Sequence, residues 1–252
     1  MDGRHRFVAI LFDLGDTLIY YDGNWPEVFA QARQAMLRSL NGDGVKTGKE
    51  FLDDFYARME GYYRERDTEF IEYTTHYVLR LTLNDWGYQS LPDEVSRRAL
   101  VSFHQVTQAS WHPEEDAIPT LQTLHQMGYR MAMISNAADD DNTQVLVDKL
   151  GARPFMEFIL SSAAQGIRKP NPLIFRSALE QMGVAPQRAV MVGDTLGADI
   201  LGAHNAGLYA IWITRRADRP ANRAHADTIR PDARVARLSE LPELMRRLEA
   251  EG

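Results

Sequence analysis

Two aspartates in this chain each follow directly on a short apolar run. Asp13 follows VAILF and opens the stretch DLGDTL, and Asp194 follows AVMVG and opens DTLGAD. In open α/β sheets, ligands gather outside the carboxyl ends of the strands where the strand order reverses, so these carboxylates converge if their strands are neighbours there. Two close carboxylates repel, and a cation or a shared proton normally reconciles them. Mg²⁺, which takes one or two carboxylates plus waters and substrate phosphate, is the economical solution.

A hydroxyl side chain marks the end of another apolar run. Ser135 follows Met131 to Ile134 within the tripeptide ISN at 134–136. Its hydroxyl and the neighbouring backbone N–H groups could hold a phosphate oxygen. A serine that caps the next helix is the competing interpretation.

A lone lysine completes the set of charged residues with a chemical use. Lys169 lies in RKP at 168–170 and is one of four lysines in a chain with twenty-four arginines. A compact ammonium group suits a position beside a phosphate, although a plain surface lysine is the alternative. Asp199 lies five residues after Asp194, where it could hold a metal-bound water, orient Lys169, or simply favour a helix N-terminus.

The four motifs FDLGDTL, ISN, RKP and GDTLGAD, in this order, resemble the haloacid dehalogenase (HAD) superfamily, whose members mostly transfer phosphoryl groups through an aspartate. The resemblance implies that Asp13 is a nucleophile that forms an aspartyl-phosphate, which water then hydrolyses. It implies that Mg²⁺ is bound by Asp13, the backbone carbonyl of Gly15 and Asp194, with Asp199 behind them. The catalytic residues it implies are Asp13, Lys169 and Ser135, and the substrate-binding residues are Thr17, Ser135, Asn136 and Lys169.

The first motif departs from the family pattern at Gly15. Most phosphatases of the family carry an aspartate there, which protonates the leaving oxygen and later activates water. General acid–base catalysis typically contributes ~10²–10⁴-fold, so we expect slow turnover or a preference for good leaving groups. Asp16 is offset by one position and need not point the same way.

Gly15 also keeps two other functions open. The 2-haloacid dehalogenases resemble this chain in using the first aspartate without a second acid, but they lack the metal motif that Asp194 and Asp199 retain here. A non-catalytic protein that binds a phosphometabolite or a protein partner is the other alternative. Transfer to a hydroxyl is disfavoured because it needs the missing acid–base group. The sequence therefore favours a Mg²⁺-dependent phosphatase acting on a small phosphorylated metabolite.

Five short apolar runs indicate the sheet that must position these residues. They cover 7–12, 130–134, 158–160, 189–192 and 209–213. Because they are short and lack alternation, they are typical of strands buried on both faces of a parallel sheet. From residue 113 on they alternate with amphipathic segments at 117–127, 139–150 and 172–182, each followed by a glycine suited to end a helix. The pattern predicts a doubly wound, Rossmann-like α/β core.

A long helical segment interrupts this core after the first strand. The sequence shows no strand signal between that strand and residue 113. Amphipathic helices are expected at 26–41, 49–65, 69–86 and 92–109. Such a stretch is too long for a loop, and many HAD proteins carry a helical cap at this point. We expect a core formed by 1–20 and 113–252, a cap formed by 21–112, and hinges near 19–22 and 110–114.

Several conspicuous side chains receive plainer interpretations. The arginine-rich segment 215–237 is expected to be a solvated loop that leads into a last helix at 239–249. The four histidines at 76, 104, 112 and 204 have no spacing that suggests a metal site. Aromatic residues at 20, 21 and 25 either line the substrate cleft or pack the cap onto the core. Arginines 58, 64 and 66 are candidates for substrate contacts.

Composition limits the partners. The 252 residues are 44% hydrophobic and 25% charged, with a net charge of −7 and no cysteine. Disulfides and thiolate chemistry are excluded, and the negative charge argues against a general nucleic-acid binder. No apolar run approaches a membrane span and no signal peptide is recognisable. We expect a cytoplasmic monomer or homodimer that binds a small phosphorylated substrate, and neither nucleic acid nor membrane.

Overall fold

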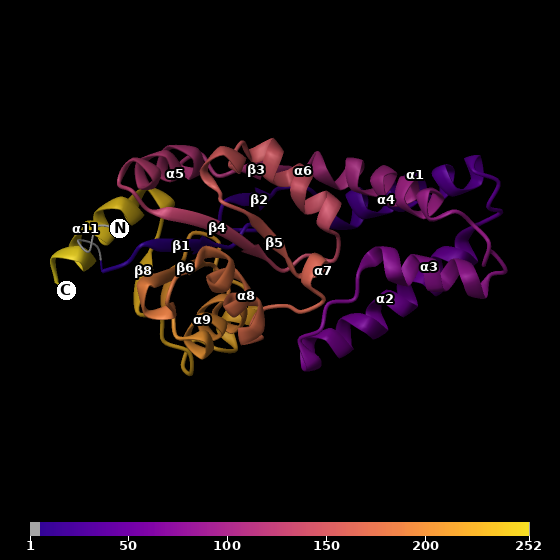
Figure 1. Cartoon of the computed structure of the whole chain (residues 1–252). Coiled ribbons are helices and arrows are strands. Elements are labelled where there is room, and N and C mark those ends of the chain that lie inside the picture. The colour runs from indigo at the N-terminus through magenta and orange to yellow at the C-terminus, as the bar shows by residue number, and fades with distance from the viewer. Residues whose placement is uncertain (1–5, 252) are drawn as a thin grey trace.

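The structure, a computed structural model, describes residues 6–251. A sheet with helices on both faces forms one part, and four helices extend from it to one side (Figure 1). Both ends of the described chain lie on the far side of the sheet from these four helices, where the backbone N–H of Phe7 donates to Glu249. None of the described helices is long and apolar enough to cross a bilayer.

Six parallel strands form the sheet, in the spatial order β5-β4-β1-β6-β7-β8. Their bounds are β1 (Ala9–Phe12), β4 (Arg130–Ser135), β5 (Ile159–Ser161), β6 (Ala189–Gly193), β7 (Tyr209–Ile213) and β8 (Ala233–Val235). At the centre, Phe12 of β1 pairs with Met133 of β4 on one side and with Val192 of β6 on the other. The chain builds the sheet outward from β1 in both directions, so the carboxyl ends of these three strands meet at the switch point. The predicted doubly wound α/β core is confirmed.

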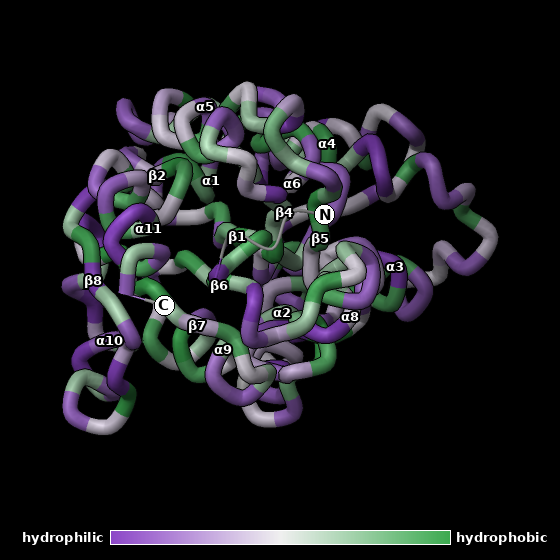
Figure 2. Tube along the Cα trace, turned by 60° about the vertical axis from the view of Figure 1, so that its left-hand side comes forward, coloured by the Kyte–Doolittle hydropathy of each residue, from purple (hydrophilic) through white to green (hydrophobic). Residues whose placement is uncertain are grey.

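Alternate residues of each central strand enter different cores, which explains the unbroken apolar runs. Ile10 and Phe12 pack on one face and Ala9 and Leu11 on the other. Figure 2 shows hydrophobic residues gathered along these central strands. The first face is covered by α5 (Ala117–Gln126), α6 (Asp140–Leu150) and α11 (Leu241–Ala250). The second is covered by α8 (Pro172–Met182) and α9 (Leu201–Ala206). A short α7 (Ser162–Gln165) follows β5.

Three helices of the core, α5, α6 and α8, match the segments expected at 117–127, 139–150 and 172–182 to within one residue at each end. The side chain of Asp139 accepts a hydrogen bond from the backbone N–H of Asn142 and so caps the start of α6. Gly151 ends the same helix with φ of 77°, a left-handed conformation that glycine adopts without a steric penalty. Ser135 is the last residue of β4, directly before the loop that this cap ends.

Four helices lie between β2 (Ile19–Tyr21) and β3 (Trp111–Pro113) and have a hydrophobic core of their own. Their bounds are α1 (Trp25–Gly42), α2 (Lys49–Glu69), α3 (Thr75–Asp85) and α4 (Asp93–Gln108). Side chains such as Met36, Phe51 and Leu79 form this core separately from the two cores on the sheet. The third helix starts later than the predicted residue 69. The reason is that Phe70 ends α2 in a left-handed conformation, after which the chain pairs at Ile71 with Ile167, flanked by backbone hydrogen bonds of Phe70 and Glu72.

An antiparallel ribbon joins the four helices to the sheet. β2 (Ile19–Tyr21) pairs with β3 (Trp111–Pro113), so the expectation of no strand before residue 113 was wrong. Strands of three residues are too short to show alternation, and their pairing depends on a contact between distant segments. The ribbon occupies the two segments that we expected to serve as hinges.

The arginine-rich segment is also more ordered than expected. It contains α10 (Pro220–Arg223) and β8, and both Arg215 and Arg216 form ion pairs with the buried carboxylate of Glu114. A plain solvated loop was therefore the wrong description. Local patterning carries no indication of this order, because Glu114 is 102 residues away from Arg216 in the chain.

Candidate active site

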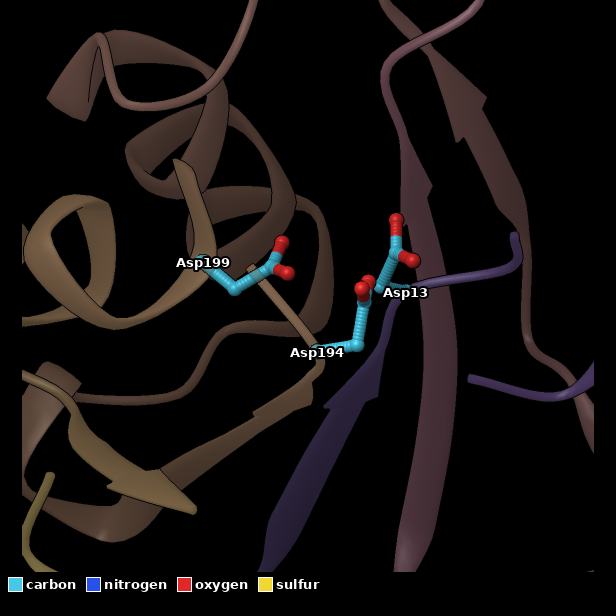
Figure 3. A group of neighbouring side chains, drawn as sticks. All are labelled: Asp13, Asp194 and Asp199. Atoms are coloured by element: carbon cyan, nitrogen blue, oxygen red, sulfur yellow. The ribbon is translucent and has the colours of Figure 1, made fainter. Parts of the chain in front are cut away.

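Three buried carboxylates meet at the carboxyl edge of the sheet. Asp13 follows β1 and Asp194 follows β6, whereas Asp199 lies in the helical turn after β6, η3 (Leu196–Ile200). One oxygen of each lies within 4.8 Å of the others, and Figure 3 shows the Asp199 carboxylate pointing toward the other two. The exposed fractions of 7%, 2% and 1% for Asp13, Asp194 and Asp199 show that this cluster is shielded from solvent.

Lys169 is the cation that joins two of these carboxylates. Its Nζ lies 2.6 Å from Asp13 Oδ1 and 2.7 Å from Asp199 Oδ1, and it donates to the backbone oxygen of Ile134 at 2.7 Å. Burial alone would lower the pKa of Lys169, but the charges of Asp13 and Asp199 outweigh it and the pKa is raised. The ammonium group therefore stays charged, and the orienting role expected for Asp199 has a direct contact behind it.

In the absence of a further cation, the negative charges of the buried carboxylates are only partly compensated. Burial raises the pKa of Asp13 to about 6, against the opposing effect of Lys169. Burial, followed by the charges of Asp13 and Asp199, raises the pKa of Asp194 to about 8. Oδ2 of Asp194 is buried without a hydrogen bond from the described residues. A cluster of hard oxygen donors with this excess negative charge suits a divalent cation such as Mg²⁺.

The backbone of Asp194 is held from two sides. Its carbonyl oxygen accepts hydrogen bonds from Trp212 Nε1 at 2.7 Å and from Asn222 Nδ2 at 2.9 Å. Asn222 is itself buried and accepts the backbone N–H of Leu196. These contacts fix where the Asp194 side chain starts, so its carboxylate is directed at the site before any ligand binds.

Arg219 was not expected at this site. Its Nη2 lies 2.6 Å from Asp16 Oδ2 and 3.2 Å from Asp194 Oδ2. The residue lies in the segment after β7, whose carboxyl end is at the same edge as that of its neighbour β6. The only indication in the sequence is that Arg219 follows the apolar run at 209–213, whose carboxyl end is expected at this edge of the sheet. Because Asp16 is engaged with Arg219, its carboxylate is not free to act as an acid in place of the one missing at Gly15.

The other predicted substrate contacts have mixed positions. Ser135 is nearly buried and lines the cavity described below. Asn136 also lines it, but its Oδ1 accepts from the backbone N–H of Lys169 and its Nδ2 donates to the Lys169 carbonyl. Both ends of the amide are thus used to hold Lys169. Thr17 is fully buried and is not among the residues that line the cavity, so the structure does not bring it to a substrate.

A cavity of about 580 Å³ opens from the carboxylates toward the four helices. Gly15 lies on its wall, and a Cβ atom built there would be 3.7 Å from the ring of Trp111, an ordinary van der Waals distance. The site therefore has room for a side chain at position 15. His104 lines the cavity as well, and its Nε2 lies 3.3 Å from Asp139 Oδ2.

The remaining candidates are engaged elsewhere. Arg58 pairs with Asp54 and Asp85 within the helical insertion. Arg66 pairs with the buried carboxylate of Glu72 and stacks on Tyr63. Neither lines the cavity. Of the aromatic residues after the first motif, the Tyr20 ring lies under the guanidinium of Arg216, Tyr21 packs between two tryptophans, and Trp25 lines the cavity.

Comparison with known proteins agrees with this arrangement. A family model described as haloacid dehalogenase-like hydrolase matches residues 7–207. A protein of Methanopyrus kandleri named glyceraldehyde 3-phosphate phosphatase is 31% identical over 95% of this chain and 97% of its own length. A Thermus thermophilus protein named phosphoserine phosphatase is 32% identical over 65% of this chain and 62% of its own.

Among solved structures, this chain is similar to a 2-haloacid dehalogenase from Pseudomonas syringae pv. tomato. The two share 28% identity with a TM-score of 0.67, covering 96% of this chain and 99% of the other. The relatives thus include both phosphatases and a dehalogenase, and only the residues of the site can choose between them.

Proposed function

Because the chain belongs to the haloacid dehalogenase-like hydrolases, we propose that it is a phosphatase that removes phosphate from a small phosphate monoester, with Asp13 as the nucleophile. The observation that carries this proposal is the cluster of three buried carboxylates around a single buried lysine. Such a cluster combines a site for a hard cation with a fixed ammonium group beside the nucleophile. The phosphatase names of the two relatives support the same choice.

Mg²⁺ is the cofactor we propose, bound by Asp13, the Gly15 backbone carbonyl and Asp194. When bound, it supplies positive charge that neutralises both the carboxylates and the phosphate oxygens of the substrate. The buried oxygen of Asp194 that lacks a hydrogen bond, and the raised pKa of Asp194, support this assignment. Asp199 is directed to Lys169 at 2.7 Å, so we place it behind the ligands and not among them.

The chain's own residues account for the chemical steps. A carboxylate oxygen of Asp13 attacks phosphorus and the bond from phosphorus to the ester oxygen breaks, giving an aspartyl-phosphate. Water then attacks the same phosphorus, releases inorganic phosphate and restores the Asp13 carboxylate. Lys169 and the Ser135 hydroxyl hold phosphate oxygens in line for both attacks, since phosphoryl transfer depends mostly on positioning and charge. Asn136 positions Lys169 through its two backbone hydrogen bonds.

The leaving oxygen receives no proton from position 15. Asp16, the next residue in the chain, forms an ion pair with Arg219 at 2.6 Å and is directed to that side chain. The ester oxygen must therefore depart as an anion, and a leaving group of low pKa is favoured. Arg219 lies beside the same corner and is suited to stabilise that developing charge.

Residues 21–112 act as a cap in this proposal. The helices of this segment supply most of the apolar lining of the cavity, whereas the sheet supplies the carboxylates. Both crossings between the core and the cap lie in the β2–β3 ribbon, and we propose that the cap opens and closes about them. Closure would exclude water from Asp13 during the first step.

The experiment that tests the phosphatase proposal is a phosphate-release screen with matched metal conditions. Purified protein is assayed with acetyl phosphate, aryl phosphates and alkyl phosphates, in Mg²⁺ and in EDTA. We expect release that depends on Mg²⁺ and is lost in Asp13→Asn. No release from any ester under either condition would contradict the proposal.

A 2-haloacid dehalogenase is the second candidate, and the structural likeness together with Gly15 favours it. Expelling halide from carbon needs no divalent cation, so the retained cluster around Asp194 counts against it. The same screen includes 2-chloropropionate. Chloride release without phosphate release would select the dehalogenase, and neither activity would point to a binding protein.

A further inference from the structure

The part of the cavity beyond the carboxylates is lined largely by aromatic rings. We call one side of it the aromatic wall, which consists of Trp25, Phe29, Tyr56, Phe103 and Trp111. Phe29 lies at its centre, with ring centroids 5.4 Å from Trp25, 5.1 Å from Tyr56 and 5.4 Å from Phe103. Such distances are those of favourable aromatic pairs, so the rings support one another's positions.

The aromatic wall begins beside the carboxylate cluster, next to Gly15. Trp111 lies beside Gly15, at 3.7 Å from the position of a Cβ atom there. Tyr21 joins Trp111 to Trp25, with ring centroids 5.4 Å and 5.1 Å from them. A leaving group that departs from phosphorus at Asp13 past Gly15 therefore meets an indole ring first and further rings after it.

The size of the cavity is out of proportion to a very small substrate. Its volume of about 580 Å³ falls within the ~300–1,000 Å³ that is usual for sites of drug-sized ligands. Beyond the rings, Met36, Met59 and Leu100 add further apolar lining. A three-carbon polar chain such as that of glyceraldehyde 3-phosphate, the substrate named for one relative, would leave most of this apolar surface without contacts.

Polar residues such as Glu60, Thr107 and Arg168 interrupt this lining, and the Tyr56 hydroxyl is among the lining groups that lack a hydrogen bond within the described residues. The hydroxyl of Tyr56 is buried and has no hydrogen bond from the described residues. Burial raises the pKa of Tyr56, so the hydroxyl stays protonated and can donate. An unpaired buried hydroxyl is unfavourable, and a polar atom on the far side of a ligand would satisfy it. His104 and Asp139 provide a second polar point on the cavity wall.

We propose that the natural substrate is an aryl phosphate, a phosphate monoester of a phenol whose ring system packs against the aromatic wall. This rests on the proposed phosphatase function and gives its substrate class. The bond from phosphorus to the phenolic oxygen breaks, the oxygen leaves with the electron pair as a phenolate, and the phenolate takes a proton from water. Because phenols are far more acidic than alkyl alcohols, this departure needs no acid at Gly15. The aromatic cavity and the missing acid thus point to the same leaving group.

Binding of non-hydrolysable phosphonates tests the proposal separately from the chemistry. Inhibition constants for methylphosphonate, benzylphosphonate and (1-naphthylmethyl)phosphonate are measured with acetyl phosphate as the substrate. Acetyl phosphate has a good leaving group and no ring, so its hydrolysis reports the proposed phosphatase function alone. We expect the inhibition constant to fall by about tenfold or more for each added ring, since each ring buries apolar surface.

Variants of the aromatic wall then locate the effect. Phe29→Ala, and Phe29→Leu in case the first variant folds poorly, should collapse the ratio of inhibition constants between methylphosphonate and the naphthyl compound. Tyr62→Ala is the matched control, because Tyr62 belongs to the same helical insertion but does not line the cavity. It should leave that ratio unchanged.

The two possible failures are distinguishable. If acetyl phosphate releases phosphate but the inhibition constants are equal across the series, the aryl substrate is overturned and the phosphatase stands. If the ratio is large but equally large in Phe29→Leu, the rings bind elsewhere and the aromatic wall is overturned. If neither acetyl phosphate nor any aryl phosphate releases phosphate, the phosphatase function fails, and the substrate class fails with it.

Discussion

The charged corner, which consists of Asp13, Lys169, Asp194 and Asp199, lies next to the aromatic wall. Electrostatic contacts organise the corner, whereas packing of neutral rings organises the wall. In the corner, buried charges are held by direct contacts of 2.6–2.7 Å between Lys169 and two aspartates, and the pKa of Asp194 is pushed to about 8. In the aromatic wall, neutral rings pack with their centroids 5.1–5.4 Å apart, and the ring contacts are of similar length. The difference indicates a division of labour. In our proposal, the corner carries out phosphoryl transfer and the aromatic wall selects the group that is attached to the phosphate.

Asp13→Asn should separate the two regions most clearly, because it should abolish turnover and leave binding at the aromatic wall intact. The amide preserves the shape of the side chain but cannot attack phosphorus, so kcat should fall by on the order of 10⁴-fold or more for every substrate. Phosphonate binding at the aromatic wall should persist. Steady-state kinetics measure the loss of kcat, and calorimetric titration with the naphthyl phosphonate measures the binding. Activity equal to that of the unmodified protein would rule out the covalent scheme.

Gly15→Asp should add a general acid at the point where the charged corner meets the aromatic wall. The site has room for the new side chain beside Trp111, and a carboxyl group there can protonate the leaving oxygen. Hydrolysis of alkyl phosphates should rise by up to ~10²-fold, and the dependence of rate on leaving-group pKa should flatten. The measurement is a series of phosphate esters with graded leaving-group pKa.

The matched control for that series is Gly15→Asn. It adds nearly the same volume but has no proton to give, so it should leave the steep dependence in place. If the unmodified protein already shows a flat series, another residue serves as the acid. Asp16 would then be the first residue to replace, together with its partner Arg219.

Asp194→Ala should separate metal binding from folding in the charged corner. Losing a direct ligand should weaken Mg²⁺ binding by at least the ~10–100-fold seen when only a supporting partner is removed. Isothermal titration calorimetry measures the affinity, with the exposed Asp227→Ala as the control. Unchanged Mg²⁺ affinity would place the metal elsewhere and return weight to the dehalogenase.

Arg219→Met should act in the opposite direction. The guanidinium lies 3.2 Å from Asp194 Oδ2 and competes electrostatically with a bound cation. Its removal should tighten Mg²⁺ binding by up to ~10-fold, given the strength of a close charge pair at the edge of a protein. The same calorimetry decides it. Weaker binding in this variant would mean that Arg219 organises the site instead of opposing the metal.

The sequence predicts the position of a site residue best where that residue type is unusual for its local pattern. Asp13, Asp194 and Lys169 were identified because a charge at the end of an apolar strand, or a rare lysine before a proline, has few structural reasons. Phe29 and Tyr56 were not, because an aromatic residue on an amphipathic helix is indistinguishable from an ordinary core residue. Arg219 and the β2–β3 ribbon depend on contacts between distant segments, and local patterning carries no information on these. Thr17 was predicted from its motif, but its neighbours bury it completely.

The smallest expected effect is on the pH dependence of stability. The pKa of Asp194 is raised in the folded protein from the ordinary 3.8 to about 8, so between these values the folded state binds more protons than the unfolded state. Stability of the metal-free protein should therefore fall as pH rises through this range. The Tm of Asp194→Asn minus that of the unmodified protein, both in EDTA, should grow from pH 5 to pH 8. Saturating Mg²⁺ should restore the Tm of the unmodified protein at pH 8. A difference independent of pH would contradict the raised pKa.

The identity of the phosphorylated residue tests the central claim most directly. The protein is mixed with an aryl phosphate and Mg²⁺, quenched in acid during turnover, and treated with borohydride, which reduces an aspartyl-phosphate to homoserine. Tandem mass spectrometry of the peptide that spans FDLGDTL then reads position 13. We predict homoserine at position 13, and none when substrate is omitted. Phosphate release that continues while position 13 remains aspartate in every quenched sample, or homoserine at another aspartate, would contradict the account.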